Sequence, residues 1–230
     1  MHQPSGPPSV AVLIPVLDEA ANLRCLLPRV VAAADEVIVC DGGSADGSPE
    51  VARRLGARVV SAPPGRGVQL NRAAAAATAD VFLFLHADTR LPPDGIEAVR
   101  RAVAGGARAG GFLVRFDSRR LLYRMGARVM SLRTRLTRAP LGDQAQFVER
   151  RTFQAVGGFR EWPILEDLDL VRRLKRSTRI AVLPLRVTTS ARRFERGGPA
   201  RTVARNWLIW GLYFLRVPPQ RLARLYRRVR

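Results

Sequence analysis

Acidic side chains follow three apolar runs of the sequence, at the point where each run ends. They are Asp18 and Glu19 after residues 10–16, Asp41 after residues 36–40, and Asp88 after residues 81–85. A carboxylate at the end of a strand can accept a hydrogen bond from a nucleobase or a ribose hydroxyl, and it can hold a divalent cation on a diphosphate. These residue types therefore predict a nucleotide site.

The same residue types also have a structural explanation, because Asp, Ser and Gly form turns and begin helices. That explanation is preferred for Asp46 and Ser48, which stand where a helix is expected to start. Ligand binding is preferred for Asp41 and Asp88, because several acidic groups converge on one edge of the expected sheet. The sequence contains neither a G-x-G-x-x-G after the first run nor a G-x-x-x-x-G-K-[ST], so binding must use carboxylates and a cation.

A sheet must position these residues, and the hydrophobic pattern of residues 9–90 predicts one. Short, continuous apolar runs alternate with amphipathic segments, which is typical of a parallel sheet with helices on both faces. Strands are expected at 10–16, 36–40, 58–60 and 81–85, and helices at 20–33, 49–55 and 67–79. Ligands of such sheets bind beyond the carboxyl ends of the strands.

The pattern is looser after residue 90. Helices are expected at 93–104, 119–136, 166–176, 200–214 and 220–229, and strands at 110–116, 147–149, 179–183 and 187–189. No signal peptide is expected from the start MHQPSGPPS. No membrane-spanning helix is expected either, because the longest apolar stretch, 207–215, is shorter than the ~20 residues that a bilayer requires.

Five motifs in order along the chain resemble those of a known family. They are Ile14-Pro15-Val16-Leu17-Asp18-Glu19, Asp41-Gly42-Gly43-Ser44-Ala45-Asp46-Gly47, Gly65-Arg66-Gly67-Val68-Gln69-Leu70-Asn71, His86-Ala87-Asp88 and Glu166-Asp167. The set resembles the family 2 glycosyltransferases of the GT-A fold, an α/β fold in which helices flank a Rossmann-like sheet. More narrowly, it is similar to the bacterial branch called transferase 2, rSAM/selenodomain-associated, or arsenosugar-biosynthesis glycosyltransferases.

This resemblance covers about residues 9–229 and implies an organisation of the chain. A GT-A domain is expected over residues 9–190, with a nucleotide-sugar half at 9–90 and an acceptor half at 91–190. A basic, amphipathic, helical extension is expected at 191–230.

The resemblance also implies a donor site for a UDP- or GDP-sugar. The residues expected to line it are Pro15, Asp18, Glu19, Asp41, Arg66, Gln69, Asn71, His86 and Asp88. Asp88 matches the last residue of the family's D-x-D motif, so it is the expected ligand for Mg²⁺ or Mn²⁺. His86 departs from the motif, because it replaces the first carboxylate; an imidazole can donate to a ribose hydroxyl or ligate a metal.

The reaction that the resemblance implies is inverting sugar transfer, which needs a base near the attacking hydroxyl. Asp167 is the expected base, with Glu166 and Asp169 as alternates, while Asp143 and Gln144 are expected acceptor contacts. The structural alternative is that the acidic residues of segment 166–169 simply favour the start of a helix, where the helix dipole attracts anions.

The charge of the chain is unevenly distributed. Residues 1–90 hold 8 Arg and 9 acids, whereas residues 91–230 hold 31 Lys+Arg and 10 acids, a net charge of +21. Segments 119–138 and 191–230 combine arginines with apolar residues, which suits either a helix on an anionic membrane or a packed helix with a solvated basic face. Nucleic-acid binding is not expected, because no recognition motif supports it.

The expected location is therefore cytoplasmic. The open alternative is peripheral attachment to the inner face of the cell membrane, where the enzyme would reach a lipid-linked acceptor. Two other functions fit the same residues. A nucleotidyltransferase would release pyrophosphate, and a non-catalytic basic protein that binds membranes or nucleic acid would turn over no donor.

Overall fold

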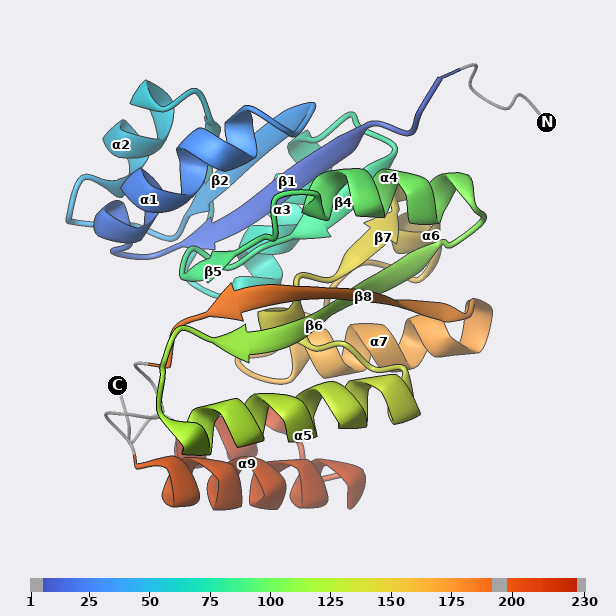
Figure 1. Cartoon of the computed structure of the whole chain (residues 1–230). Coiled ribbons are helices and arrows are strands. Elements are labelled where there is room, and N and C mark those ends of the chain that lie inside the picture. Colours follow the sequence, from blue (N-terminus) through green and yellow to red (C-terminus); the bar gives the residue numbers. More distant parts are fainter. Residues whose placement is uncertain (1–5, 192–197, 227–230) are drawn as a thin grey trace.

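The computed structural model describes residues 6–191 and 198–226 (Figure 1). Its centre is an eight-stranded sheet with the strand order β3-β2-β1-β4-β7-β6-β8-β5. Side chains of β1 (Val10–Val16) alternate between two hydrophobic cores, one on each face. Val10, Val12 and Ile14 face one core and Ala11 and Leu13 the other, as the two-residue period of a strand requires.

The first half of the chain confirms the predicted alternation of strands and helices. Its elements are α1 (Ala20–Val31), β2 (Glu36–Asp41), α2 (Ser48–Arg54), β3 (Arg58–Ser61), α3 (Arg66–Ala76) and β4 (Val81–Phe84). Strands β3, β2, β1 and β4 are parallel neighbours, so their carboxyl ends meet at one edge. Helices α1 and α2 cover one face of the sheet and α3 covers the other.

The second half adds antiparallel strands to the parallel sheet of the first half. Its first elements are β5 (Thr89–Arg90), α4 (Gly95–Ala104), β6 (Ala109–Phe116), α5 (Leu121–Thr137), η1 (Gly142–Gln144), β7 (Phe147–Glu149) and α6 (Arg150–Ala155). Strand β7 runs antiparallel to both β4 and β6, and β5 runs antiparallel to β8 (Ile180–Thr189). The sheet is therefore mixed, because β7 enters it in the direction opposite to its neighbours β4 and β6.

Strand β8 joins two segments that the sequence predicts as separate strands. It runs parallel to β6, and the register slips between Phe112 and Leu113, whose partners are Leu183 and Arg186. The extra residues on β8 include Pro184, which has no backbone N–H to give to the ladder. The proline therefore forms a bulge inside β8, at the position where the sequence pattern predicts the end of one strand.

Three helices complete the fold: α7 (Glu166–Ser177), α9 (Pro199–Phe214) and α10 (Pro219–Tyr226). The last two helices are held by a separate small core that includes Leu168 of α7, Ile209 and Tyr213 of α9, and Leu222 of α10. In Figure 1, α5 and α9 lie along the side of the molecule opposite to α1 and α2. Among the described residues, no helix is long and apolar enough to cross a membrane.

Candidate functional site

The loops after β1 and β2 are joined through Ser44. Its hydroxyl donates to Oδ1 of Asp41 at 2.5 Å and accepts the backbone N–H of Asp18 at 2.9 Å. Asp18 has a φ of 56° and accepts the N–H of Ala45 at 2.8 Å, while Asp41 is buried and also accepts the N–H of Gly43 at 3.0 Å. These bonds hold two of the predicted donor-binding carboxylates at the sheet edge, in a fixed relation to each other.

Asp46 and Ser48 take the structural roles preferred from the sequence. Asp46 accepts hydrogen bonds from the Ser48 hydroxyl at 2.5 Å and the Ala20 N–H at 2.8 Å, and these bonds lower the pKa of Asp46. The buried Ser48 oxygen accepts the N–H of Glu19 at 2.9 Å. Together they tie the start of α1 to the start of α2.

Gln69 and Asn71 on α3, two of the predicted donor contacts, use their side-chain amides to bond to backbone groups. Gln69 is buried, and its Nε2 donates to the carbonyls of Val16 and Cys40, at 2.8 Å each. Asn71 exchanges hydrogen bonds of 2.9 Å with both the N–H and the carbonyl of Phe159. These bonds give both residues a structural role: Gln69 fixes the ends of β1 and β2, and Asn71 fixes the loop before α7.

Helix α3 begins very close to the same loop. A Cβ added to Gly67 would lie 2.5 Å from the carbonyl oxygen of Arg160, so only glycine fits at that position. The nucleotide-side loop is thereby held against the segment that leads into the acidic helix α7.

His86, Gly142 and Asp167 converge beyond the end of β4. The N–H of Gly142 donates to Oδ2 of Asp167 at 2.7 Å, and the N–H of Leu168 donates to Oδ1 at 2.8 Å. A Cβ added to Gly142 would lie 3.1 Å from that Oδ2 and 3.2 Å from Nε2 of His86. The fold thus brings together one predicted donor residue and the predicted base, from segments about eighty residues apart.

Glu166 is buried and pairs with Arg66, whose Nε lies 2.8 Å from Oε1. Burial raises the pKa of Glu166, partly opposed by the Arg66 guanidinium, and the carboxylate in turn raises the pKa of Arg66. Within the described part of the chain, the second oxygen, Oε2, has no hydrogen-bond donor. Both residues are predicted site residues, and they bind each other across the two halves of the domain.

The short helix η1 carries the two predicted acceptor contacts. Burial, followed by the nearby Asp167 carboxylate, raises the pKa of Asp143 to about 6. Gln144 is fully buried and uses its amide inside the protein: Nε2 donates to the Phe112 carbonyl at 2.9 Å, and Oε1 accepts from Arg133 at 2.9 Å. Asp143 therefore remains a candidate contact, while Gln144 positions η1.

Arg133 is a site residue that sequence reasoning missed. It extends from α5 to Gln144 and the Ala139 carbonyl, and its guanidinium lies 5.3 Å from the ring centre of Trp210 on α9. No sequence signal marks it, because it is one of seven arginines in residues 119–138. Ser44 was missed as well, although it lies inside one of the quoted motifs.

The side chains at the sheet edge suit a divalent cation that binds together with the diphosphate of a nucleotide. Among the described residues, no group of three His, Cys, Asp or Glu side chains is arranged to hold a metal ion. Mg²⁺ normally uses only one or two carboxylates, with substrate phosphates and water filling the other positions. A single carboxylate such as Asp88, beside His86, meets that requirement.

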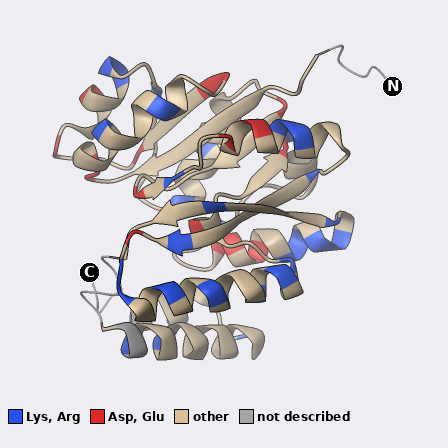
Figure 2. Cartoon of the chain, in the orientation of Figure 1, with Lys and Arg blue, Asp and Glu red and all other residues tan. Residues whose placement is uncertain are grey.

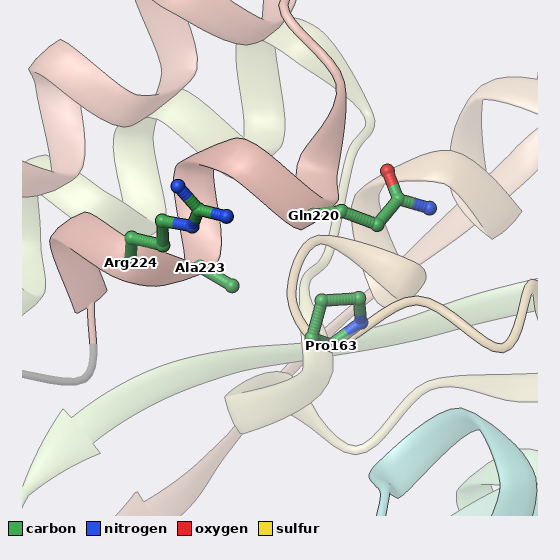
Figure 3. Close-up of a pocket in the computed structure, with 4 residues that line it drawn as sticks. All are labelled: Pro163, Gln220, Ala223 and Arg224. Atoms are coloured by element: carbon green, nitrogen blue, oxygen red, sulfur yellow. The ribbon is translucent and has the colours of Figure 1, made fainter.

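Two hollows lie away from Asp88. One, of about 250 Å³, is formed by Pro163 together with Gln220, Ala223 and Arg224 of α10, as Figure 3 shows. The other, of about 450 Å³, is lined by residues of the β3–α3 loop, by α3 residues that include Asn71, and by Glu161. The second borders the loop expected to hold the nucleotide, whereas the first lies between α10 and the segment before α7.

Residues 11–158 match the family model described as glycosyl transferase family 2, which is more than half of the chain. The chain therefore belongs to glycosyl transferase family 2. It is 38% identical over 113 residues to undecaprenyl-phosphate 4-deoxy-4-formamido-L-arabinose transferase of Aeromonas hydrophila, covering 42% of this chain and 34% of that protein. It is 34% identical over 93 residues to glucosyl-3-phosphoglycerate synthase of Mycobacterium tuberculosis, covering 35% and 29%. The matched segments span about a third of each relative.

Solved structures share the fold. Glucosyl-3-phosphoglycerate synthase of M. tuberculosis, in complex with Mg²⁺ and UDP, aligns with a TM-score of 0.59 at 24% identity, over 78% of this chain and 70% of that one. TarS of S. aureus, in complex with UDP-GlcNAc, aligns with a TM-score of 0.62 at 16% identity, over 79% and 58%. The predicted GT-A fold is confirmed.

Proposed function

We propose that this chain transfers a sugar, with inversion, from a UDP-sugar to an acceptor hydroxyl. The observation that carries the proposal is the convergence of His86, Gly142 and Asp167 beyond the end of β4. The acceptor oxygen attacks the anomeric carbon, the bond from that carbon to the diphosphate breaks, and the acceptor proton passes to Asp167. Both Asp167 oxygens accept a backbone N–H, which orients the carboxylate and leaves a lone pair on each oxygen for the proton.

The donor is proposed to lie along the ends of β1, β2 and β4. Asp41 and Asp18 would contact the base and the ribose, and Pro15 and Glu19 would lie on either side of these groups. His86 would contact the sugar nucleotide beside Gly142. Asp88 would hold Mg²⁺ or Mn²⁺, which stabilises the charge on the departing diphosphate. Because Arg66 is already paired with Glu166, we propose that it holds the donor loop against α7.

Uridine is the proposed nucleotide because two structural neighbours were solved with UDP or UDP-GlcNAc. Divalent metal use is supported in the same way, by complexes of the mycobacterial synthase with Mg²⁺ or Mn²⁺. The narrower placement in the rSAM/selenodomain-associated branch remains a proposal that rests on the sequence motifs alone.

The acceptor is proposed to be lipid-linked, on the cytoplasmic side of the membrane. The support is the relative from A. hydrophila, whose name includes the lipid undecaprenyl phosphate. The acceptor proposed here is a hydroxyl on a lipid-linked molecule, not a lipid phosphate itself. In this proposal Asp143 of η1, whose carboxyl lies near that of Asp167 on α7, contacts the acceptor.

A two-stage experiment tests the proposed function. The unfolding temperature is measured with UDP, GDP and their sugars, each with and without Mn²⁺. We expect the largest increase with a UDP-sugar together with the metal. Turnover of that donor with membrane extract as acceptor source should then release UDP. Release of pyrophosphate from a nucleoside triphosphate would instead indicate a nucleotidyltransferase, and stabilisation by no nucleotide would contradict the proposal.

A further inference from the structure

The outward face of α5 is apolar, although it lies on the surface. Six side chains form this face: Leu121, Leu122, Met125, Val129, Leu132 and Leu136, with exposed fractions between 54% and 76%. Of the four buried residues of α5, Ala127, Ser131 and Thr134 are instead small or polar, and the fourth is Tyr123. The helix therefore turns its most hydrophobic side away from the core, which is the reverse of an ordinary surface helix.

Helix α9 exposes a second apolar stripe. Val203, Trp207, Leu208, Phe214 and Leu215 are exposed, with Trp207 at 69%, while Ile209 and Tyr213 pack in the small core below. In Figure 1 the two helices run side by side, and Arg133 of α5 lies over the Trp210 ring of α9. We call the exposed apolar residues of α5 and α9 the apolar face. Large apolar side chains exposed in such number on two neighbouring helices indicate an interaction site.

The charges around the apolar face select its partner. Residues 119–138 contain seven arginines and no acid, and Figure 2 shows these basic residues along α5. Arg124, Arg128 and Arg135 are exposed on the same helix as the leucines. A second copy of this chain would bring the same unpaired positive charge against itself. An anionic bilayer instead offers acyl chains to the leucines and phosphates to the arginines.

We propose that the apolar face of α5 and α9 docks on the surface of an anionic membrane. The helices lie in the plane of the headgroups, with leucine, methionine and Trp207 side chains inserted and arginines on lipid phosphates. Arg133 connects this surface to the site, since it binds Gln144, the residue that follows Asp143 on η1. Docking therefore places the acceptor side of the site next to the bilayer. The docking surface itself does not rest on the proposed function, whereas the placement of the acceptor side does.

Vesicle co-sedimentation of the whole chain tests the proposal, with phosphatidylglycerol-containing and pure phosphatidylcholine vesicles across a salt series and no sugar nucleotide. We expect binding to the anionic vesicles at low salt and release at high salt. Replacing apolar residues with Gln, as in Met125→Gln/Val129→Gln/Leu132→Gln and in Trp207→Gln, should weaken binding. Arg124→Gln/Arg128→Gln should weaken it roughly tenfold or more at low salt.

The matched control is Arg53→Gln/Arg54→Gln, which removes the same charge from exposed positions on α2. It should bind as the parent chain does. Thermal unfolding of every variant checks folding, which we expect to survive because the replaced side chains are exposed. Equal binding by the α5 and α2 variants, equal binding to both vesicle types, or no binding by the parent chain would overturn the proposal. So would a concentration-dependent dimer that the apolar-face variants abolish, because a second copy would then be the occupant.

Discussion

Arg66 Nε lies 2.8 Å from Glu166 Oε1, and this ion pair joins the start of α3 to the start of α7. The first residue belongs to the half that carries the nucleotide edge and the second to the half that carries the proposed base. Glu166 is 2% exposed, so its carboxylate has no access to water as an alternative partner. The pair therefore couples the stability of the fold to the relative position of the two halves of the site.

Arg66→Gln should destabilise the protein strongly. The variant leaves a buried carboxylate without its cation, which costs about 2–4 kcal/mol of unfolding free energy after allowance for the partial exposure of Arg66. Urea unfolding measures the change, and Arg66→Gln/Glu166→Gln should recover part of it, because the orphaned charge is gone. Arg53→Gln, which breaks only the exposed pair with Glu50, should cost less than ~1 kcal/mol. Equal losses in both arginine variants would contradict the coupling.

Asp143→Asn should make the protein more stable above pH 6. Folding raises the pKa of this carboxyl from 3.8 to about 6, so the folded state binds its proton more tightly than the unfolded state. That contribution is complete below pH ~4 and is lost as the pH rises to ~6. The variant should gain up to about 1–3 kcal/mol at pH 7.5. Thermal unfolding at pH 4.5 and 7.5 checks this, with the exposed Asp94→Asn as control. A less stable variant at pH 7.5 would show that the charged form is favoured instead.

Much of the fold followed from the sequence because its first half obeys local rules. The strands β1, β2 and β4 are continuous apolar runs, and each is followed by the turn that positions a carboxylate. The same rules placed β7 but could not give its direction, which depends on partners distant in sequence. They divided β8 into two strands, because Pro184 forms a bulge inside it. Periodicity also identified the apolar side of α5 but not its direction, since a pattern cannot show which side faces the core.

The site was predicted in composition more than in geometry. The motifs located His86 and Asp167, but the convergence of these two side chains at Gly142 depends on packing between distant segments. Gln69 was expected to line the nucleotide, and the structure shows that its amide also satisfies two strand-end carbonyls. Side-chain type alone cannot distinguish these roles, because the same amide serves a ligand or a backbone equally well.

Gly142→Ala should lower activity with little effect on stability. Its Cβ would enter the space between Asp167 Oδ2, at 3.1 Å, and His86 Nε2, at 3.2 Å, and would crowd both side chains. Gly126→Ala on α5 is the control, because its Cβ would meet nothing within 4 Å, and it should stabilise the helix by about 0.5–1 kcal/mol. Turnover of UDP-sugar and thermal unfolding measure the two effects. Full turnover by Gly142→Ala would place the reaction away from this glycine.

Asp167→Asn should slow transfer by ~10²–10⁴-fold while donor affinity stays close to that of the parent chain. The amide cannot take the acceptor proton, although its oxygen can still accept one of the two backbone N–H groups. Asp169→Asn is the neighbouring control, since Asp169 is engaged at 2.7 Å with Arg173. Turnover and UDP binding are measured together. Parental turnover in Asp167→Asn, or the full loss in Glu166→Gln alone, would move the base to another residue.

Asp88→Ala should abolish the metal-dependent part of donor binding. The carboxylate is the one predicted ligand for a cation at the end of β4, and without it Mg²⁺ or Mn²⁺ must rely on phosphates and water alone. Titration of UDP with and without Mn²⁺ should show a metal-dependent gain in affinity for the parent chain and none for the variant. Binding of UDP in the absence of metal should persist, because Asp18 and Asp41 remain in place. The control is Asp46→Ala, which should keep the metal response, because within the described ranges this carboxylate bonds only to backbone N–H groups and to Ser48. An undiminished Mn²⁺ effect in Asp88→Ala would show that the cation is held elsewhere, and would leave His86-Ala87-Asp88 as a structural turn.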